Sequence, residues 1–188
     1  NDPAYWFLEK INCDYIDISS YALEHEVLVE AAQGINLDIN HGNYPFVTSS
    51  SCLPQAAASI LGFPFHLVAN TICVMKAYDT RSGKDTRFYP HLPNTEELYN
   101  YLSENNSIFK KIAKLGNEKG VTTGRDRQIS YINLDKFANN LKMVLPNIIV
   151  INKLDILEAL KVYKVYSGHK IWTFENQGVF IAAVENAI

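Results

Sequence analysis

Short runs of apolar residues recur along the chain, and a polar segment follows each of them. Apolar residues dominate positions 26–30, the middle of 66–78 around 71–75, and 147–151. Such runs indicate strands that are covered on both faces, as in parallel sheets. Residues 162–166 and 170–174 instead alternate between apolar and polar positions, around Ser167-Gly168-His169. This alternation predicts a β-hairpin.

Helical segments are predicted between these strands. The hydroxyl groups of Ser49-Ser50-Ser51 as caps, Pro54 in the first turn and Gly62 as the stop favour the first helix. Helices are expected over residues 54–61, 107–115 and 134–143, and a further helix is expected to begin at a capping box over 94–97. Gly116 would end the helix over 107–115. Loops are expected over residues 79–93 and 120–127. Strands that alternate with helices predict an α/β fold, in which helices flank a largely parallel sheet and a hairpin follows near the carboxy terminus.

Composition narrows the class of protein. The chain has 188 residues, of which 47% are apolar and 20% are charged, which suits a single α/β domain over residues 1–188. A net charge of −3 is not the basic footprint of a nucleic-acid-binding protein. No apolar run approaches the roughly 20 residues of a membrane span, and no signal peptide opens the chain.

The cysteines and the first residues add two expectations. Cys13, Cys52 and Cys73 are odd in number and far apart, so they fit small buried residues in a reducing compartment such as the cytoplasm. The chain begins with Asn1-Asp2-Pro3 rather than Met, which suggests a piece of a longer protein.

Three polar segments follow the carboxyl ends of predicted strands. They contain Gln33, Arg81 and Asn152-Lys-Leu-Asp155. Open α/β sheets bind ligands at that edge. The carboxylate of Asp155 is able to accept hydrogen bonds from both N1–H and the 2-amino group of guanine, whereas adenine offers neither donor. The alternative is structural, because Asp155 is equally suited to cap a helix over 156–160.

The longer motifs resemble a known family. Residues 30–50 match the signature E-G-A-Q-G-x-x-L-D-I-D-x-G-x-Y-P-x-V-T-S-S except at Ala31 and Asn40, and residues 76–83 match K-A-Y-x-T-R-V-G except at Ser82. Residues 116–127 contain G-N-E-x-G-x-T-T-G-R. With Asn152-Lys-Leu-Asp155 following in order, the chain resembles the adenylosuccinate synthetase family over about residues 26–166. The first signature is long and specific.

The resemblance implies a fold and an activity. The fold would be the P-loop-NTPase-like synthetase fold, in incomplete form. The family joins aspartate to the 6-position of inosine monophosphate with GTP and Mg²⁺, by phosphorylating the purine 6-oxygen and then displacing phosphate. Such a site must hold several anions together by positioning and electrostatics. Partners would be these small molecules and a second subunit in a cytoplasmic homodimer, with no nucleic acid and no membrane.

The resemblance also assigns roles to individual residues. It implies an inosine monophosphate site at Gln33, Thr48 and Arg125, an aspartate site at Thr122, Thr123, Arg125 and Arg127, and a GTP site at Lys153, Asp155 and Arg127. Asp38 and His41 lie inside the first signature, and we expect them to have a structural role.

The chain also departs from the family. The family's G-D-E-G-K-G motif, catalytic aspartate and catalytic histidine are near its amino terminus, and this sequence contains no such motif. No catalytic residue is therefore assigned here, and the Mg²⁺ ligands are expected in an absent amino-terminal part. The chain resembles the carboxy-terminal part of a longer synthetase, and we expect it to be inactive alone. Two alternatives remain, namely a phage-type 2-aminoadenylosuccinate synthetase acting on dGMP and a non-catalytic guanine-nucleotide-binding module.

Overall fold

A computed structural model describes residues 17–83, 85, 88, 95–120 and 124–187. The chain divides into two compact units, with the boundary between Ala69 and Asn70. Each unit is described by itself below. The prediction of a single domain over residues 1–188 stays a prediction.

The first unit is built from short helices and loops. It contains α2 (Ile18–Glu24), the 3-10 turn η1 (Ile35–Leu37), α3 (Pro54–Leu61) and the 3-10 turn η2 (Phe65–Leu67). The predicted helix over 54–61 is confirmed, with Pro54 in its first turn and Gly62 in a left-handed conformation at its end (φ 76°). The predicted hydroxyl cap is wrong, because the N-cap is Leu53, which makes no side-chain cap bond.

The strand predicted over residues 26–30 is also wrong. These residues have no regular secondary structure, and the side chain of Leu28 is 87% exposed. A strand is stable only when neighbouring strands satisfy its backbone groups, and within the described part of the chain no strand pairs with this segment. The apolar composition alone was therefore insufficient to make it a strand.

Within the described ranges the strands lie in the second unit and form three ladders. β1 (Ile72–Lys76) pairs in parallel with β5 (Ile148–Asn152), and β2 (Asp79–Ser82) pairs antiparallel with β3 (Arg127–Ser130). In the third ladder, β4 (Ile132–Asn133) lies parallel to β6 (Lys164–Ser167), which pairs antiparallel with β7 (Lys170–Thr173). The α/β class is thus confirmed, although β2 occupies a segment that was predicted to be a loop.

The predicted hairpin is confirmed in β6 and β7. Gly168 and His169 connect the two strands, and both have positive φ angles of 55° and 62°. Two such residues are typical of the tight turn that matches the twist of paired strands. The strand register, with Lys164 opposite Thr173, follows from that turn.

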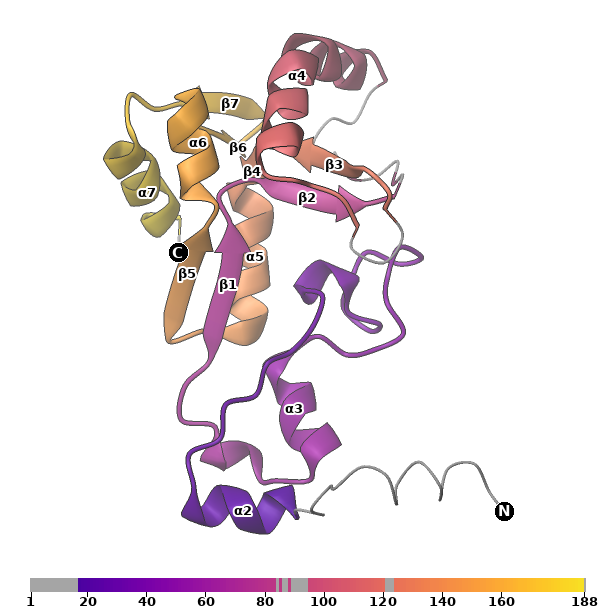
Figure 1. The fold of residues 1–188 in the computed structure, drawn as a ribbon, viewed down its shortest axis with the longest axis vertical. Helices are drawn as coiled ribbons and strands as arrows, with labels where there is room; N and C mark the ends of the chain where they lie inside the picture. Colours follow the sequence, from indigo (N-terminus) through magenta and orange to yellow (C-terminus); the bar gives the residue numbers. More distant parts are fainter. Residues whose placement is uncertain (1–16, 84, 86–87, 89–94, 121–123, 188) are drawn as a thin grey trace. The chain divides into compact units, whose positions relative to one another are not determined.

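Helices surround the strands of the second unit (Figure 1). They are α4 (Thr95–Leu115), α5 (Leu134–Val144), α6 (Leu154–Leu160) and α7 (Gln177–Glu185). α5 confirms its prediction. α4 is one helix of 21 residues where two shorter helices were expected, and the residue that would cap its start lies outside the described residues. The sequence did not predict α7.

The core of this unit joins α4, β3, β6 and α7. Its most deeply buried side chains include Ile112, Ile129, Val165 and Phe180, none of which is more than 4% exposed. The core holds the end of α4 against β3, so the loop after α4 starts from a rigid base. Among the described residues no helix is both long and apolar enough to cross a bilayer.

Candidate functional site

The parallel pair β1–β5 brings two of the predicted ligand-binding segments to one sheet edge. Lys76 at the end of β1 lies opposite Asn152 at the end of β5. The backbone N–H of Ala77 donates to the carbonyl oxygen of Asn152 over 2.8 Å. The Lys-Ala-Tyr segment and the Asn-Lys-Leu-Asp segment therefore leave the sheet side by side, at the edge where open α/β sheets bind ligands.

Lys153 forms the junction between β5 and α6. It is the N-cap of α6 with a left-handed backbone (φ 65°), and its N–H donates to the side-chain oxygen of Asn152 over 2.7 Å. Its Nζ donates to the carbonyl oxygen of Gly116 over 3.3 Å. Lys153 thus ties the strand end to the loop that follows α4.

Asp155 lies in the first turn of α6 and is exposed. The structural alternative, in which Asp155 is the N-cap of this helix, is wrong because Lys153 has that position and no side chain caps the helix. A carboxylate in the first turn is still favoured by the helix dipole. Its side chain is therefore in reach of solvent and of a ligand at this edge.

Glu118 is the centre of a buried network that the sequence did not predict. Its carboxylate accepts hydrogen bonds from Lys76 Nζ at 2.7 Å to both oxygens, from the Tyr78 hydroxyl at 2.7 Å and from Arg127 Nη1 at 2.9 Å. Glu118 is only 3% exposed. The only available signal was that Lys76 and Glu118 lie inside the matched motifs, but neither had been given a role.

The pKa values of these groups reflect burial and mutual contact. Burial alone would raise the pKa of Glu118, but the hydrogen bonds from Lys76 and Tyr78 and the charge of Lys76 hold it below its usual value. Burial lowers the pKa of Lys76 although Glu118 opposes the change. Burial and the hydrogen bond to Glu118 raise the pKa of the Tyr78 hydroxyl. Charge effects from Lys153 on Lys76 and from Asp155 on Tyr78 connect the network to the start of α6.

Arg125 and Arg127, where the loop after α4 meets β3, differ in their environment. Arg125 is exposed, and its carbonyl oxygen accepts from the N–H of Gly120 over 2.8 Å. Arg127 begins β3 and is 25% exposed, with Nη1 on Glu118. The predicted aspartate-binding residues Thr122 and Thr123 lie outside the described residues.

A hollow of about 820 Å³ lies between α4 and β3, within the range of small-molecule sites. Its lining includes Glu118 and Arg127, together with Lys110, Lys114 and Lys119. Arg127 therefore lines this hollow together with the acidic Asp126.

Gln33 and Thr48 belong to the first unit, whereas the other described site residues belong to the second. Gln33 is exposed with a left-handed backbone (φ 64°), and the N–H of Thr48 donates to the carbonyl oxygen of Leu37 over 2.7 Å. That Gln33 and Thr48 bind a nucleotide stays a prediction.

Asp38 organises the loop between Gln33 and Thr48. It is completely buried and accepts hydrogen bonds from the backbone N–H groups of Asn40, His41 and Cys52 and from the hydroxyl of Ser51. Burial opposes ionisation, but these donors hold the pKa of Asp38 far below its usual value. This arrangement supports the structural role expected of Asp38 and, through its backbone and ring contacts, of His41.

Two further expectations concern cysteine and metal. Cys52 is buried and Cys73 half-buried, and both are free thiols, whereas Cys13 lies outside the described residues. Within the described ranges, no group of three or more His, Cys, Asp or Glu side chains is placed to hold a metal ion. The described residues therefore offer Mg²⁺ no cluster of three such ligands.

Comparison with known proteins identifies the family. The family model of adenylosuccinate synthetase matches residues 7–185. This chain belongs to the adenylosuccinate synthetase family. The synthetase of Caenorhabditis elegans is 38% identical over 146 residues, which are 78% of this chain and 29% of the relative. Adenylosuccinate synthetase 1 of Pseudoalteromonas translucida is 34% identical over 77% of this chain and 32% of its own length.

A solved structure agrees with the fold. The adenylosuccinate synthetase of Plasmodium falciparum superposes with a TM-score of 0.77 at 22% identity, over 97% of this chain and 51% of that chain. At this identity the likeness shows the fold alone. The chain spans about a third of the length of the curated relatives named above.

Proposed function

We propose that this chain is part of an enzyme that joins aspartate to the 6-position of inosine monophosphate, with hydrolysis of GTP, to give adenylosuccinate. The observation that carries the proposal is the family match over residues 7–185. The shared sheet edge of the Lys-Ala-Tyr and Asn-Lys-Leu-Asp segments supports it, because these matched motifs meet at one place.

In this proposal Lys153 and Asp155 select the base of the nucleotide that donates phosphate. Asp155 is exposed at the start of α6, where its carboxylate would accept from N1–H and the 2-amino group of guanine. The aliphatic part of Lys153 would pack against the flat base. Adenine would leave the carboxylate without donors, so GTP is the expected phosphate donor.

In the same proposal, residues of the loop after α4 and of the first unit would bind the anionic groups of aspartate and of the nucleotides. Arg125 and Arg127, with Thr122 and Thr123, would bind the aspartate carboxylates, and Arg127 would also reach GTP. Inosine monophosphate would contact Gln33, Thr48 and Arg125. Mg²⁺ would accompany the phosphates of GTP, and the enzyme would act as a cytoplasmic homodimer.

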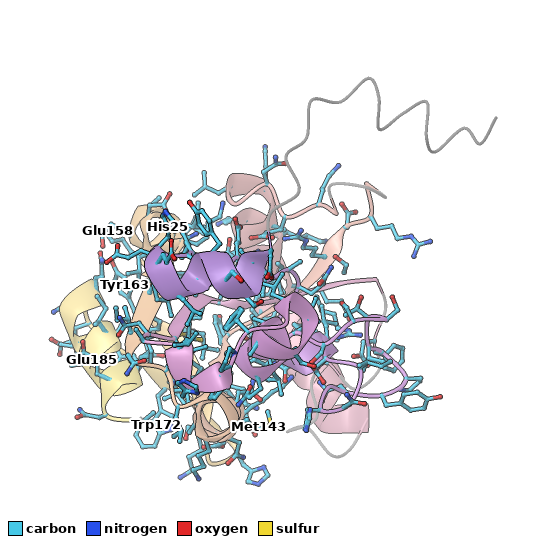
Figure 2. The ribbon with its side chains drawn as sticks, turned by 90° about the horizontal axis from the view of Figure 1, so that it is seen from below. His25, Met143, Glu158, Tyr163, Trp172 and Glu185 are labelled. Atoms are coloured by element: carbon cyan, nitrogen blue, oxygen red, sulfur yellow. The ribbon has the colours of Figure 1, made fainter. Side chains whose placement is uncertain are left out.

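Calorimetric titration with GTP and ATP tests the donor assignment. We expect GTP to bind at least about tenfold more tightly than ATP, because only guanine offers two hydrogen-bond donors to the carboxylate of Asp155. Asp155→Asn should abolish most of that preference. Glu185→Gln, an exposed carboxylate at the end of α7 (Figure 2), is the matched control and should bind as the wild type does. Equal affinity for GTP and ATP in the wild type would contradict the proposal.

The acceptor is tested separately with the protein in its natural length. Formation of adenylosuccinate from inosine monophosphate, GTP and aspartate is expected. A preference for dGMP would instead favour the phage-type activity, and GTP binding without any product would favour a non-catalytic module.

A further inference from the structure

We propose that Glu118 is a positioning residue, which holds the guanidinium of Arg127 in a fixed direction toward an anionic ligand. The proposal rests on the function proposed above, in which Arg127 binds carboxylate or phosphate groups. Nothing in the motif match gives Glu118 a role.

The contacts of Arg127 are the first argument. Glu118 accepts from Nη1 at 2.9 Å, while Nε is buried and has no hydrogen-bond partner among the described residues. A guanidinium is a rigid planar fork, so a hydrogen bond on Nη1 restricts the directions that its other N–H groups take. The remaining N–H groups are then presented to a ligand at a lower cost in side-chain entropy.

The support of Glu118 itself is the second argument. Its backbone N–H donates to the carbonyl oxygen of Ala113 in the last turn of α4, over 2.9 Å. Its own carbonyl oxygen accepts from the N–H of Arg127 over 3.2 Å. Lys76 and Tyr78 hold the carboxylate from the end of β1. Glu118 therefore joins a helix end and two strands, and site residues carried by rigid elements are the more precisely placed.

Charge balance is the third argument. Glu118 is a single carboxylate that faces two cations, Lys76 and Arg127, and both are mostly buried at 28% and 25% exposed. At the start of α6, Lys153 adds a third positive charge through its effect on Lys76, and Asp155 adds a second negative charge through its effect on Tyr78. The cluster therefore keeps excess positive charge, which suits an anionic ligand, and Glu118 separates the two cations that would otherwise repel each other.

A double-mutant cycle with GTP as the probe tests whether Glu118 acts through Arg127. Calorimetry would compare the wild type with Glu118→Gln, Arg127→Ala and the double variant. We expect Glu118→Gln to weaken GTP binding about tenfold, which corresponds to one lost charge-assisted bond. In the Arg127→Ala background the same change should cost less than about twofold. An equal loss in both backgrounds would overturn the proposal, since a merely structural role predicts additivity.

A second measurement needs no ligand. Nuclear magnetic resonance of ¹⁵N-labelled arginine reports the rotation of the Arg127 guanidinium, whose signal is assigned by its loss in Arg127→Lys. We expect slow rotation in the wild type and faster rotation in Glu118→Gln. Unchanged rotation overturns the positioning role, whereas slow rotation without any GTP binding overturns only the proposed function.

Two further variants distinguish a loss of positioning from simple misfolding. Glu118→Asp keeps the charge that pairs with Lys76 but withdraws the carboxylate by one methylene, so it should fold and still speed the rotation of Arg127. The matched control is Glu158→Gln in α6, because Glu158 also accepts from a lysine and a tyrosine, Lys161 and Tyr163. Glu158 and Tyr163 are labelled in Figure 2. Glu158→Gln should leave both readouts unchanged, and an equal effect there would overturn the proposal.

Discussion

At the scale of single residues, two aspartates show how the environment decides ionisation. Asp38 is surrounded by N–H and O–H donors, which stabilise its charged form. Asp79 accepts a long hydrogen bond of 3.4 Å from the N–H of Asn133, and the charge of Lys136 lies nearby. Burial dominates at Asp79 and raises its pKa to about 6.

Asp79 should make the stability of the second unit depend on pH. Its folded pKa of about 6 lies above the unfolded value of 3.8, so its favourable contribution is complete below about pH 4 and is lost as the pH rises through 6. We expect Asp79→Asn to gain about 2 kcal/mol relative to the wild type between pH 4 and pH 7. Urea denaturation at several pH values measures this difference.

The control for Asp79→Asn is the same change at Asp126, whose side chain is 88% exposed. Asp126→Asn should follow the wild type at every pH. A constant difference between Asp79→Asn and the wild type from pH 4 to pH 7 would contradict the assignment.

At the scale of elements, the turn after α4 depends on a close approach. Gly116 follows the last residue of α4, and a Cβ atom added to it would lie 2.4 Å from the hydroxyl of Tyr78 and 3.0 Å from the carbonyl oxygen of Ile112. The Tyr78 hydroxyl is held by Glu118, so it is not free to move away. Glycine is therefore required here for space.

Gly116→Ala should destabilise the second unit by about 1–3 kcal/mol, as overpacking does, and should loosen the Tyr78–Glu118 bond. Thermal unfolding followed by circular dichroism measures the loss. Gly178→Ala is the matched control, because its added Cβ meets only Asn176 Oδ1 at 3.3 Å, inside α7 where alanine is favoured. The prediction fails if both variants have the same midpoint.

At the scale of the whole molecule, one face of the parallel pair β1–β5 remains exposed. Ile72, Val74, Ile148 and Val150 are 43–66% exposed, whereas Met75 and Ile151 on the other face pack against the core. Parallel sheets are normally covered on both faces. This chain therefore displays an apolar surface of branched side chains.

We expect this face to bind a fluorescent hydrophobic dye such as anilinonaphthalene sulfonate. Replacing Val74 and Val150 by Thr should reduce the fluorescence while changing stability by less than about 1 kcal/mol, because Thr also suits strands. Val165→Thr is the control, since Val165 is 1% exposed and the change should destabilise the fold instead. Unchanged fluorescence in the Val74 and Val150 variant would show that the dye binds elsewhere.

Local patterns predicted the elements whose stability is mostly local. The helix over 54–61, the helix that begins at Leu134 and the hairpin around Gly168 all depend on end signals and turn residues that lie within them. The strand expected at 26–30 failed for the opposite reason, since a strand needs partners that its own residues do not supply. α7 was missed because its apolar residues form no clear stripe.

The amino-acid sequence by itself determined the family, through motifs specific enough to exclude chance, and it named the residues expected to bind nucleotide and aspartate. Only the tertiary structure decided how they are held. The sequence separates Lys76, Glu118, Arg127 and Lys153, whereas parallel pairing and the packing of α4 on β3 bring them to one sheet edge. Hydrogen bonds and burial act through space, so the central role of Glu118 has no signature in its neighbours along the chain.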